Sequence, residues 1–364
     1  MQSLTLQHRL TDRIVLSNDG SFLRFAFINQ LLDIVYRSKD PRVILDGLRV
    51  VCQDDFSEER EKISQYKERM YDETLSLISD GVFSLGQICE AVLILSKFYS
   101  NDKKRSLEMA DRLWTGIMDK AEKELDINTL ISVFRTLPCL SQSRDLVFKM
   151  VSNKACDLWK ELKTKDILEI LRVLNVMGQV QCLHSQRLTL SMISQWSLVN
   201  VHNLKEQELL AMVVCMDKMD FVSGNFLHTL EKYMKARGVQ IKEVDLVAAT
   251  CDYCDHQKLI SKPILEASAE YFVEHCNGLN TPQINSIAKV FGNLNIHPIN
   301  GFKFWDKLEA IVEQKFAEFP PKDLVHLMLS FVYIEKFPVS LAPKIFNPNF
   351  IDRLETCQGK LFKI

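Results

Sequence analysis

Residues 284–294 read INSIAKVFGNL and place apolar side chains at offsets 0, 3, 7 and 10 from Ile284. This spacing is typical of one face of an amphipathic α-helix. The pattern recurs about every 40 residues, and a regular period of this length indicates stacked helical repeats, in which each repeat buries its apolar face against its neighbours. The seven copies, which we call the pattern helices, begin at Ile88, Leu130, Ile167, Leu209, Leu246, Ile284 and Leu324.

A second helix is expected between successive pattern helices. Residues 304–312, for example, carry apolar side chains at helical spacing, as do residues 107–117. Good N-cap residues stand before four of the pattern helices, and strand signals are almost absent. We therefore expect an all-α fold, a right-handed α-solenoid of helix-turn-helix repeats of about 40 residues. The four expected N-caps are Ser84, Asp126, Thr164 and Thr281.

Composition limits the kind of surface that the protein can present. The 364 residues are 47% hydrophobic and 25% charged, which is typical of a folded, soluble chain. The formal net charge is −2, whereas proteins that hold nucleic acid without regard to sequence are usually strongly basic, so any basic surface must be local. No apolar run reaches the roughly 18 residues that predict a membrane span.

The sequence lacks the motifs of common enzymes. It contains no G-x-G, so the dinucleotide fingerprint and the kinase glycine loop are both absent. There is also no phosphate-binding loop of the G-x-x-x-x-G-K-[ST] type and no H-E-x-x-H. Together with a repeat architecture, this argues against an enzyme. We expect no catalytic residue, no cofactor and no small-molecule substrate.

One cysteine pair has a spacing that is also found in metal sites. Cys251 and Cys254 stand three residues apart and are followed by His256, with His275 and Cys276 on the next helix. Zinc takes four such ligands in a tetrahedron, but turns rather than helices normally hold such pairs. The interpretation that we favour is that both thiols pack as small apolar groups, so no metal is expected.

The polar side of the pattern helices is the candidate binding surface. It lies at offsets 2, 5 and 9, opposite the apolar stripe. Repeat proteins that read single-stranded RNA present a few polar side chains per repeat, with basic residues for the phosphates. A soluble array also needs solvated faces, and periodicity alone favours this plainer interpretation. The RNA-binding candidates are Lys97, Ser132, Arg135, Arg172, Lys218, Ser286, Lys289 and His326.

The last quarter of the chain resembles the first FAST subdomain of the FAST kinase domain-containing (FASTK) family. That subdomain has a Leu-Asn-x-x-Pro step after one helix, a Phe-Pro after the next, and a closing segment with spaced Phe and Leu residues. The helical repeats upstream look like the octotricopeptide repeats that precede this subdomain in the family. The matching residues are Leu294, Asn295, Pro298, Phe337, Pro338, Ile345, Phe346, Phe350 and Leu354.

The resemblance implies four regions: atypical N-terminal helices over 1–60, a repeat array over 61–280, a helical region like FAST subdomain 1 over 281–355, and a tail over 356–364. The family continues into a second FAST subdomain and a RAP domain, so the chain is expected to be a fragment that lacks both and also lacks a presequence. No motif supports the word kinase in the family name.

The resemblance also implies a function. We expect a mitochondrial matrix protein that binds single-stranded mitochondrial RNA, with other RNA-granule proteins as further partners. It would regulate the stability, processing or translation of mitochondrial mRNA, on which expression of the respiratory chain depends. The alternative is a helical-repeat scaffold for protein partners that binds no RNA.

Overall fold

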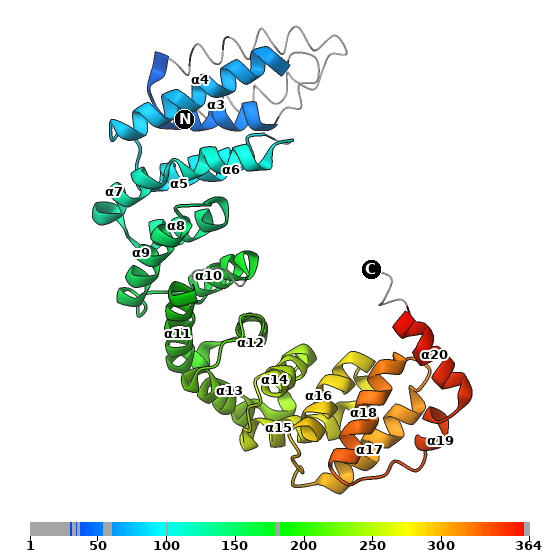
Figure 1. The fold of residues 1–364 in the computed structure, drawn as a ribbon. Helices are drawn as coiled ribbons and strands as arrows, with labels where there is room; N and C mark the ends of the chain where they lie inside the picture. The colour runs from blue at the N-terminus through cyan, green and yellow to red at the C-terminus, as the bar shows by residue number, and fades with distance from the viewer. Residues whose placement is uncertain are drawn as a thin grey trace. The chain divides into compact units, whose positions relative to one another are not determined.

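The computed structural model describes residues 30, 34, 37–53, 60–99, 101–178 and 183–359. These residues form helices and connecting turns without any strand, so the all-α prediction is confirmed (Figure 1). Much of the predicted N-terminal region and the end of the predicted tail lie outside the described residues. No helix in the described ranges is long and apolar enough to cross a bilayer. The chain divides into two compact units, residues 1–154 and 155–364.

In the first unit, pattern helix α5 packs between α3 and α8, and it also contacts α6 and α7. The helix expected over residues 107–117 is in fact two, because it breaks at Arg112 and Leu113. After the break, Gly116 of α7 lies directly against Ile78 of α4. The helices are α3 (Pro41–Gln53), α4 (Arg60–Ser79), α5 (Leu85–Leu95), α6 (Lys103–Asp111), α7 (Trp114–Glu124) and α8 (Ile127–Thr136), and α9 (Arg144–Asp157) crosses the division.

In the second unit, alternate helices pack side by side in two layers. The pattern helices α10, α12, α14, α16 and α18 form one layer, and α11, α13, α15 and α17 form the other (Figure 1). The helices are α10 (Thr164–Met177), α11 (Leu183–Asn200), α12 (Glu206–Lys218), α13 (Gly224–Arg237), α14 (Val244–His256), α15 (Lys262–His275), α16 (Thr281–Asn293), α17 (Gly301–Gln314), α18 (Pro321–Tyr333), α19 (Ala342–Ile345) and α20 (Pro348–Gly359).

Four of the five pattern helices of the second unit end in the same way, α10 being the exception. After α12, α14, α16 and α18, one residue adopts a left-handed conformation with φ between 50° and 58°. The amide of the next residue then donates to the carbonyl five residues earlier, as Phe221 does to Met216 at 3.0 Å. This is the Schellman ending, which usually uses glycine. The chain therefore turns back alike after each of these helices, although the residues concerned are Asp220, Lys258, Asn295 and Glu335.

Carboxylates from one repeat cap helices of the next. Asp111 of α6 accepts hydrogen bonds from the Ser141 amide at 2.8 Å and the Ser143 hydroxyl at 2.6 Å, just before α9. Glu309 of α17 accepts from the amide and hydroxyl of Ser340, just before α19. Because the first amides of a helix lack partners within it, these acceptors stabilise the helix start and join neighbouring repeats.

The predicted N-caps are partly correct. Ser84 and Asp126 cap their helices through reciprocal hydrogen bonds with the residue three positions on. Thr164 and Thr281 are instead the first helical residues, and the caps are Lys163 and Asn280. Asn280 is the cap because its side-chain Oδ1 accepts a hydrogen bond from the Gln283 amide at 2.9 Å. Helix ends of this kind are the part of a sequence prediction most often displaced by one residue.

A close approach between α16 and α18 supplies a test of the layered packing. A methyl group at Gly292 would overlap the Cα and Cβ atoms of Ser330 and lie 2.8 Å from its Oγ. We expect Gly292→Ala to lower the free energy of unfolding in urea by about 1–3 kcal/mol through overpacking. Gly224→Ala is the control, because a methyl group there meets nothing within 4 Å. Equal effects of the two changes would contradict this packing.

The Asp111 cap makes stability depend on pH. Burial raises the pKa of Asp111, but hydrogen bonds from Ser143 and nearby amides outweigh it, so the pKa lies below its ordinary 3.8. The carboxylate therefore stabilises the fold at neutral pH, and this contribution is lost as pH falls below that value. Because solvent screens this carboxylate, we expect Asp111→Asn to lower the free energy of unfolding by only about 0.5–1 kcal/mol at pH 7. Urea unfolding should show the difference shrink in acid, and a difference that grows in acid would refute the assignment.

Candidate nucleic-acid interface

The eight predicted RNA-binding residues all belong to pattern helices or their immediate ends. None of the eight is buried, since five are exposed and Ser132, Ser286 and Lys289 are half-buried, but their surroundings differ from one helix to the next. In the first unit, Lys97 follows α5 and is exposed, and Ser132 and Arg135 lie on the adjacent α8. Arg172 lies on α10, Lys218 on α12, Ser286 and Lys289 on α16, and His326 on α18.

The α10–α12 pair carries two exposed cations, one on each helix. Lys218 Nζ donates to the Asn175 carbonyl at 2.9 Å, which holds its charge over the end of α10. Arg172 is exposed one turn before Asn175 on the same helix. Within the described ranges, no carboxylate lies within ion-pair distance of either side chain. A backbone carbonyl does not neutralise an ammonium, so this place remains positively charged.

The two candidates on α16 are engaged with the preceding repeat. Lys289 Nζ lies 2.9 Å from Asp252 Oδ1 of α14, at ion-pair distance but outside hydrogen-bond geometry. The Ser286 hydroxyl donates to the other oxygen of Asp252 at 2.8 Å. The Lys289 side chain is only 20% exposed. Its charge is therefore largely neutralised in place, which makes it a weaker partner for phosphate than the sequence suggests.

The α14 helix presents a different face from the one predicted. Its residues at offsets 2, 5 and 9 are Ala248, Cys251 and Asp255, and all three are buried. Asp255 accepts from the Asn293 amide group of α16 at 2.9 and 3.0 Å. Asp217 of α12 likewise contacts His256 of α14 at 3.0 Å. Sequence reasoning missed these lateral contacts, because it considered the helices one at a time. The sequence did hold a signal for these contacts, namely the aspartates at offset 8 of α12 (Asp217) and at offsets 6 and 9 of α14 (Asp252 and Asp255).

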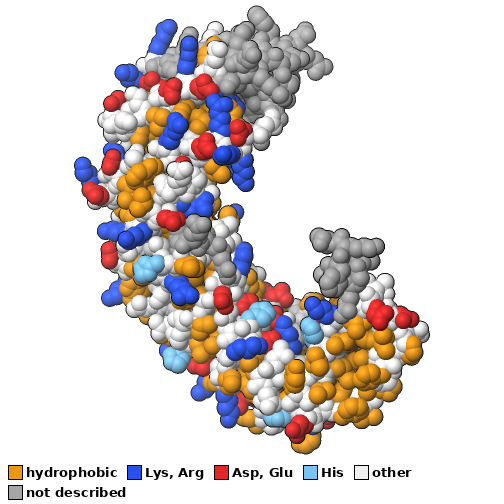
Figure 2. All heavy atoms as spheres, viewed as in Figure 1, with side chains coloured by type: hydrophobic (Ala, Val, Ile, Leu, Met, Phe, Trp, Pro, Cys, Tyr) orange, Lys and Arg blue, Asp and Glu red, His pale blue; other side chains and the backbone are white. Residues whose placement is uncertain are grey.

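The last pattern helix offers an apolar face. His326 is exposed on α18, as predicted, but Leu329, Val332 and Tyr333 on the same helix are each about half exposed (43%, 55% and 52%). Figure 2 shows hydrophobic side chains gathered over α17 and α18. Exposed apolar patches of this kind mark contact surfaces rather than phosphate-binding ones.

The cysteine pair is packed in the core. Burial raises the pKa of the Cys254 thiol to about 12 and also raises that of Cys251, so both are protonated thiols. His256 faces Asp217, and the His275 ring lies 2.9 Å from the Val239 carbonyl. In the described part of the chain, no three His, Cys, Asp or Glu side chains come together as metal ligands do. Zinc binds thiolates, so this geometry favours the packing interpretation.

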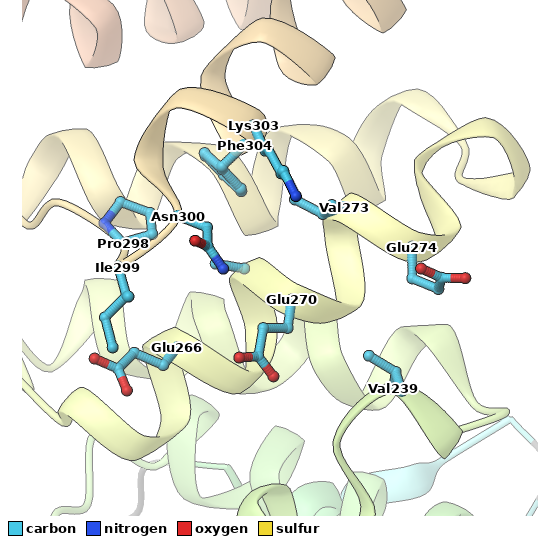
Figure 3. A pocket seen from close by; sticks show the side chains of 11 residues that line it. Val239, Glu266, Glu270, Val273, Glu274, Pro298, Ile299, Asn300, Lys303 and Phe304 are labelled. Atoms are coloured by element: carbon cyan, nitrogen blue, oxygen red, sulfur yellow. The ribbon is translucent and has the colours of Figure 1, made fainter.

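A cavity of about 300 Å³ lies between α15 and α17 (Figure 3). Glu266, Glu270 and Glu274 stand one turn apart along its α15 wall, and Lys303 extends from α17 toward Val273. Val273 and Phe304 supply apolar lining. The walls thus carry opposite charges.

The chain matches the family model described as FAST kinase-like protein, subdomain 1, over residues 284–355. It is 26% identical over 239 residues to the bovine (Bos taurus) protein named FAST kinase domain-containing protein 3, mitochondrial, which covers 66% of this chain and 36% of that protein. With the human (Homo sapiens) protein of the same name the identity is 27%, over 64% of this chain and 34% of the relative.

The chain thus spans about a third of the length of these relatives. The matched segment begins at Ile284, the first residue of the sixth pattern, and ends within α20, and the similarity to the relatives extends well beyond it into the upstream helices. These similarities, to the subdomain 1 model and to relatives over about 65% of the chain, support placing the chain in the FAST kinase domain-containing (FASTK) family.

Proposed function

We propose that the protein is an RNA-binding α-solenoid of mitochondria. In this proposal the pattern-helix layers hold single-stranded mitochondrial RNA through its phosphates, in the matrix, without a catalytic step. Binding would regulate the stability, processing or translation of mitochondrial mRNA and so support expression of the respiratory chain. The relatives' names, which place those proteins in mitochondria, support the compartment. The hand of the solenoid, the regional boundaries at residues 60 and 280, and RNA-granule partners stay predictions.

One observation carries the RNA-binding proposal. Arg172 and Lys218 come from adjacent pattern helices and are exposed, Lys218 reaches the Asn175 carbonyl one turn after Arg172, and neither has an acidic partner in the described ranges. Two cations from successive repeats can contact successive phosphates, which is how a repeat array follows a strand. The near-neutral net charge is compatible with this, because Asp217 of α12 and Asp255 of α14 are engaged with neighbouring helices.

A protein scaffold is the second candidate, and the apolar face of α18 favours it. Leu329, Val332 and Tyr333 form a stripe that a solvated helix does not need. The two functions predict different sensitivities. Phosphate binding weakens with salt, whereas an apolar contact does not.

Charge removal on α10 and α12 tests the RNA proposal. Arg172→Ala and Lys218→Ala should each weaken binding of a single-stranded RNA, measured by fluorescence anisotropy. Each should also reduce the slope of log affinity against log salt by about 0.7, the value for one phosphate contact on a single strand.

Lys289→Ala is the matched control. It removes the same charge from another pattern helix, but Lys289 is paired with Asp252, so the salt slope should stay unchanged. RNA binding by the wild type that does not depend on salt would contradict the proposal. So would equal slopes in all three variants.

A further inference from the structure

Two loops on the second unit expose aromatic rings beside lysines. The loop after α16 leads into Phe302, which is 77% exposed, and the loop after α18 carries Phe337, which is 70% exposed. The two loops are alike in structure. Each starts with a residue in the left-handed conformation, Asn295 or Glu335, and has a proline three residues later, Pro298 or Pro338. Lys303 and Lys336 are the chain neighbours of the two rings.

One ring and one lysine join the two loops. Lys336 Nζ lies 4.2 Å from the centroid of the Phe302 ring, a cation–π contact. In the described ranges, Lys336 has no carboxylate within ion-pair distance. Lys303 instead lines the cavity that also carries the glutamates of α15. The loops therefore bring the exposed Phe302 ring and the Lys336 ammonium together, with the exposed Phe337 next to Lys336 in the chain.

The base beneath this cluster is rigid. Phe304 and Trp305, directly after Phe302 and Lys303, are buried and stack with Phe291 and Phe331 of the pattern helices. The second loop is tied to the same helix, because Glu309 accepts both the amide and the hydroxyl of Ser340. Rings on such a base lose little conformational freedom on binding, which favours affinity.

We propose that Phe302 and Phe337 are a stacking platform for bases of single-stranded RNA, with Lys336 meeting an adjoining phosphate. Proteins that hold single strands combine aromatic faces for the bases with cations for the backbone, and that is the combination present here. The proposal rests on the RNA-binding function proposed above and adds a second contact, distinct from Arg172 and Lys218.

A protein partner is the competing occupant, because Ile299 and Val339 are also exposed nearby. The charge distribution favours RNA. An apolar partner that covered Phe302 would also bury the ammonium of Lys336 without neutralising it, which is costly. A nucleotide offers a base to the ring and a phosphate to the ammonium at the same time. Asp306 and Glu335 are exposed on the same segments, so these segments are not basic overall, and the contact with phosphate rests on the position of Lys336 beside the Phe302 ring.

The test compares an oligoadenylate of about 15 nucleotides, within the site sizes of such grooves, with an abasic ribose-phosphate strand of equal length. Phe302→Ala and Phe337→Ala should each weaken binding of the oligoadenylate about tenfold, the loss of one stacked base. Binding of the abasic strand should not change. Both rings are exposed, so the variants should unfold at the wild-type temperature.

Two further variants separate stacking from apolar packing. Phe337→Leu keeps apolar surface but has no π-face, so it should bind oligoadenylate as weakly as Phe337→Ala. Phe337→Trp should keep the affinity, and its fluorescence should be quenched by the stacked base. If Phe337→Leu, or both alanine variants, bind oligoadenylate with wild-type affinity, the platform proposal is wrong, and the surface instead suits a protein partner. If Arg172→Ala still weakens binding in that case, the proposed function stands without the platform. If the wild type shows no salt-dependent binding of RNA, both the proposed function and the platform are contradicted.

Discussion

The burial of each pattern helix between its neighbours is the constraint on which the rest of the structure depends. A helix pair of this length cannot hide its apolar face alone, so each repeat needs the next one. The contact is seen most fully where Phe272, Phe291, Phe304, Trp305 and Phe331 stack through α15–α18, with ring centroids about 5 Å apart. The apolar stripe determines which sides are left for polar groups, and the repeated helix endings and carboxylate caps keep neighbouring repeats in register.

The sequence predicted this framework well because the core pattern is local. An apolar residue every three or four positions shows the pattern helices directly, and all seven are helices in the structure. The endings were less predictable, because Asp220, Lys258, Asn295 and Glu335 take a conformation for which glycine is the usual signal. The break between α6 and α7 could not be predicted from the sequence either, since apolar side chains continue at helical spacing across it.

The candidate surface was harder to predict, because it depends on contacts between residues 34–43 positions apart. Arg172, Lys218 and Lys289 look alike in the sequence. Only the neighbouring helix distinguishes them, because Asp252 neutralises Lys289 while the Asn175 carbonyl leaves the charge of Lys218 in place. The same holds for Phe302, whose exposure and lysine neighbour follow from the way that two loops meet. In this account affinity comes from phosphates and base faces, neither of which reads sequence strongly.

The central claim is that the polar side of the pattern helices, together with the loops at α17, contacts RNA. Photo-cross-linking of a thiouridine-labelled single strand, followed by mass spectrometry of the protein, tests it most directly. The account predicts cross-linked peptides that contain Arg172 or Lys218, and others that contain Phe302 or Phe337. Cross-links confined to α13 and α15, or none at all with the folded protein, would contradict it.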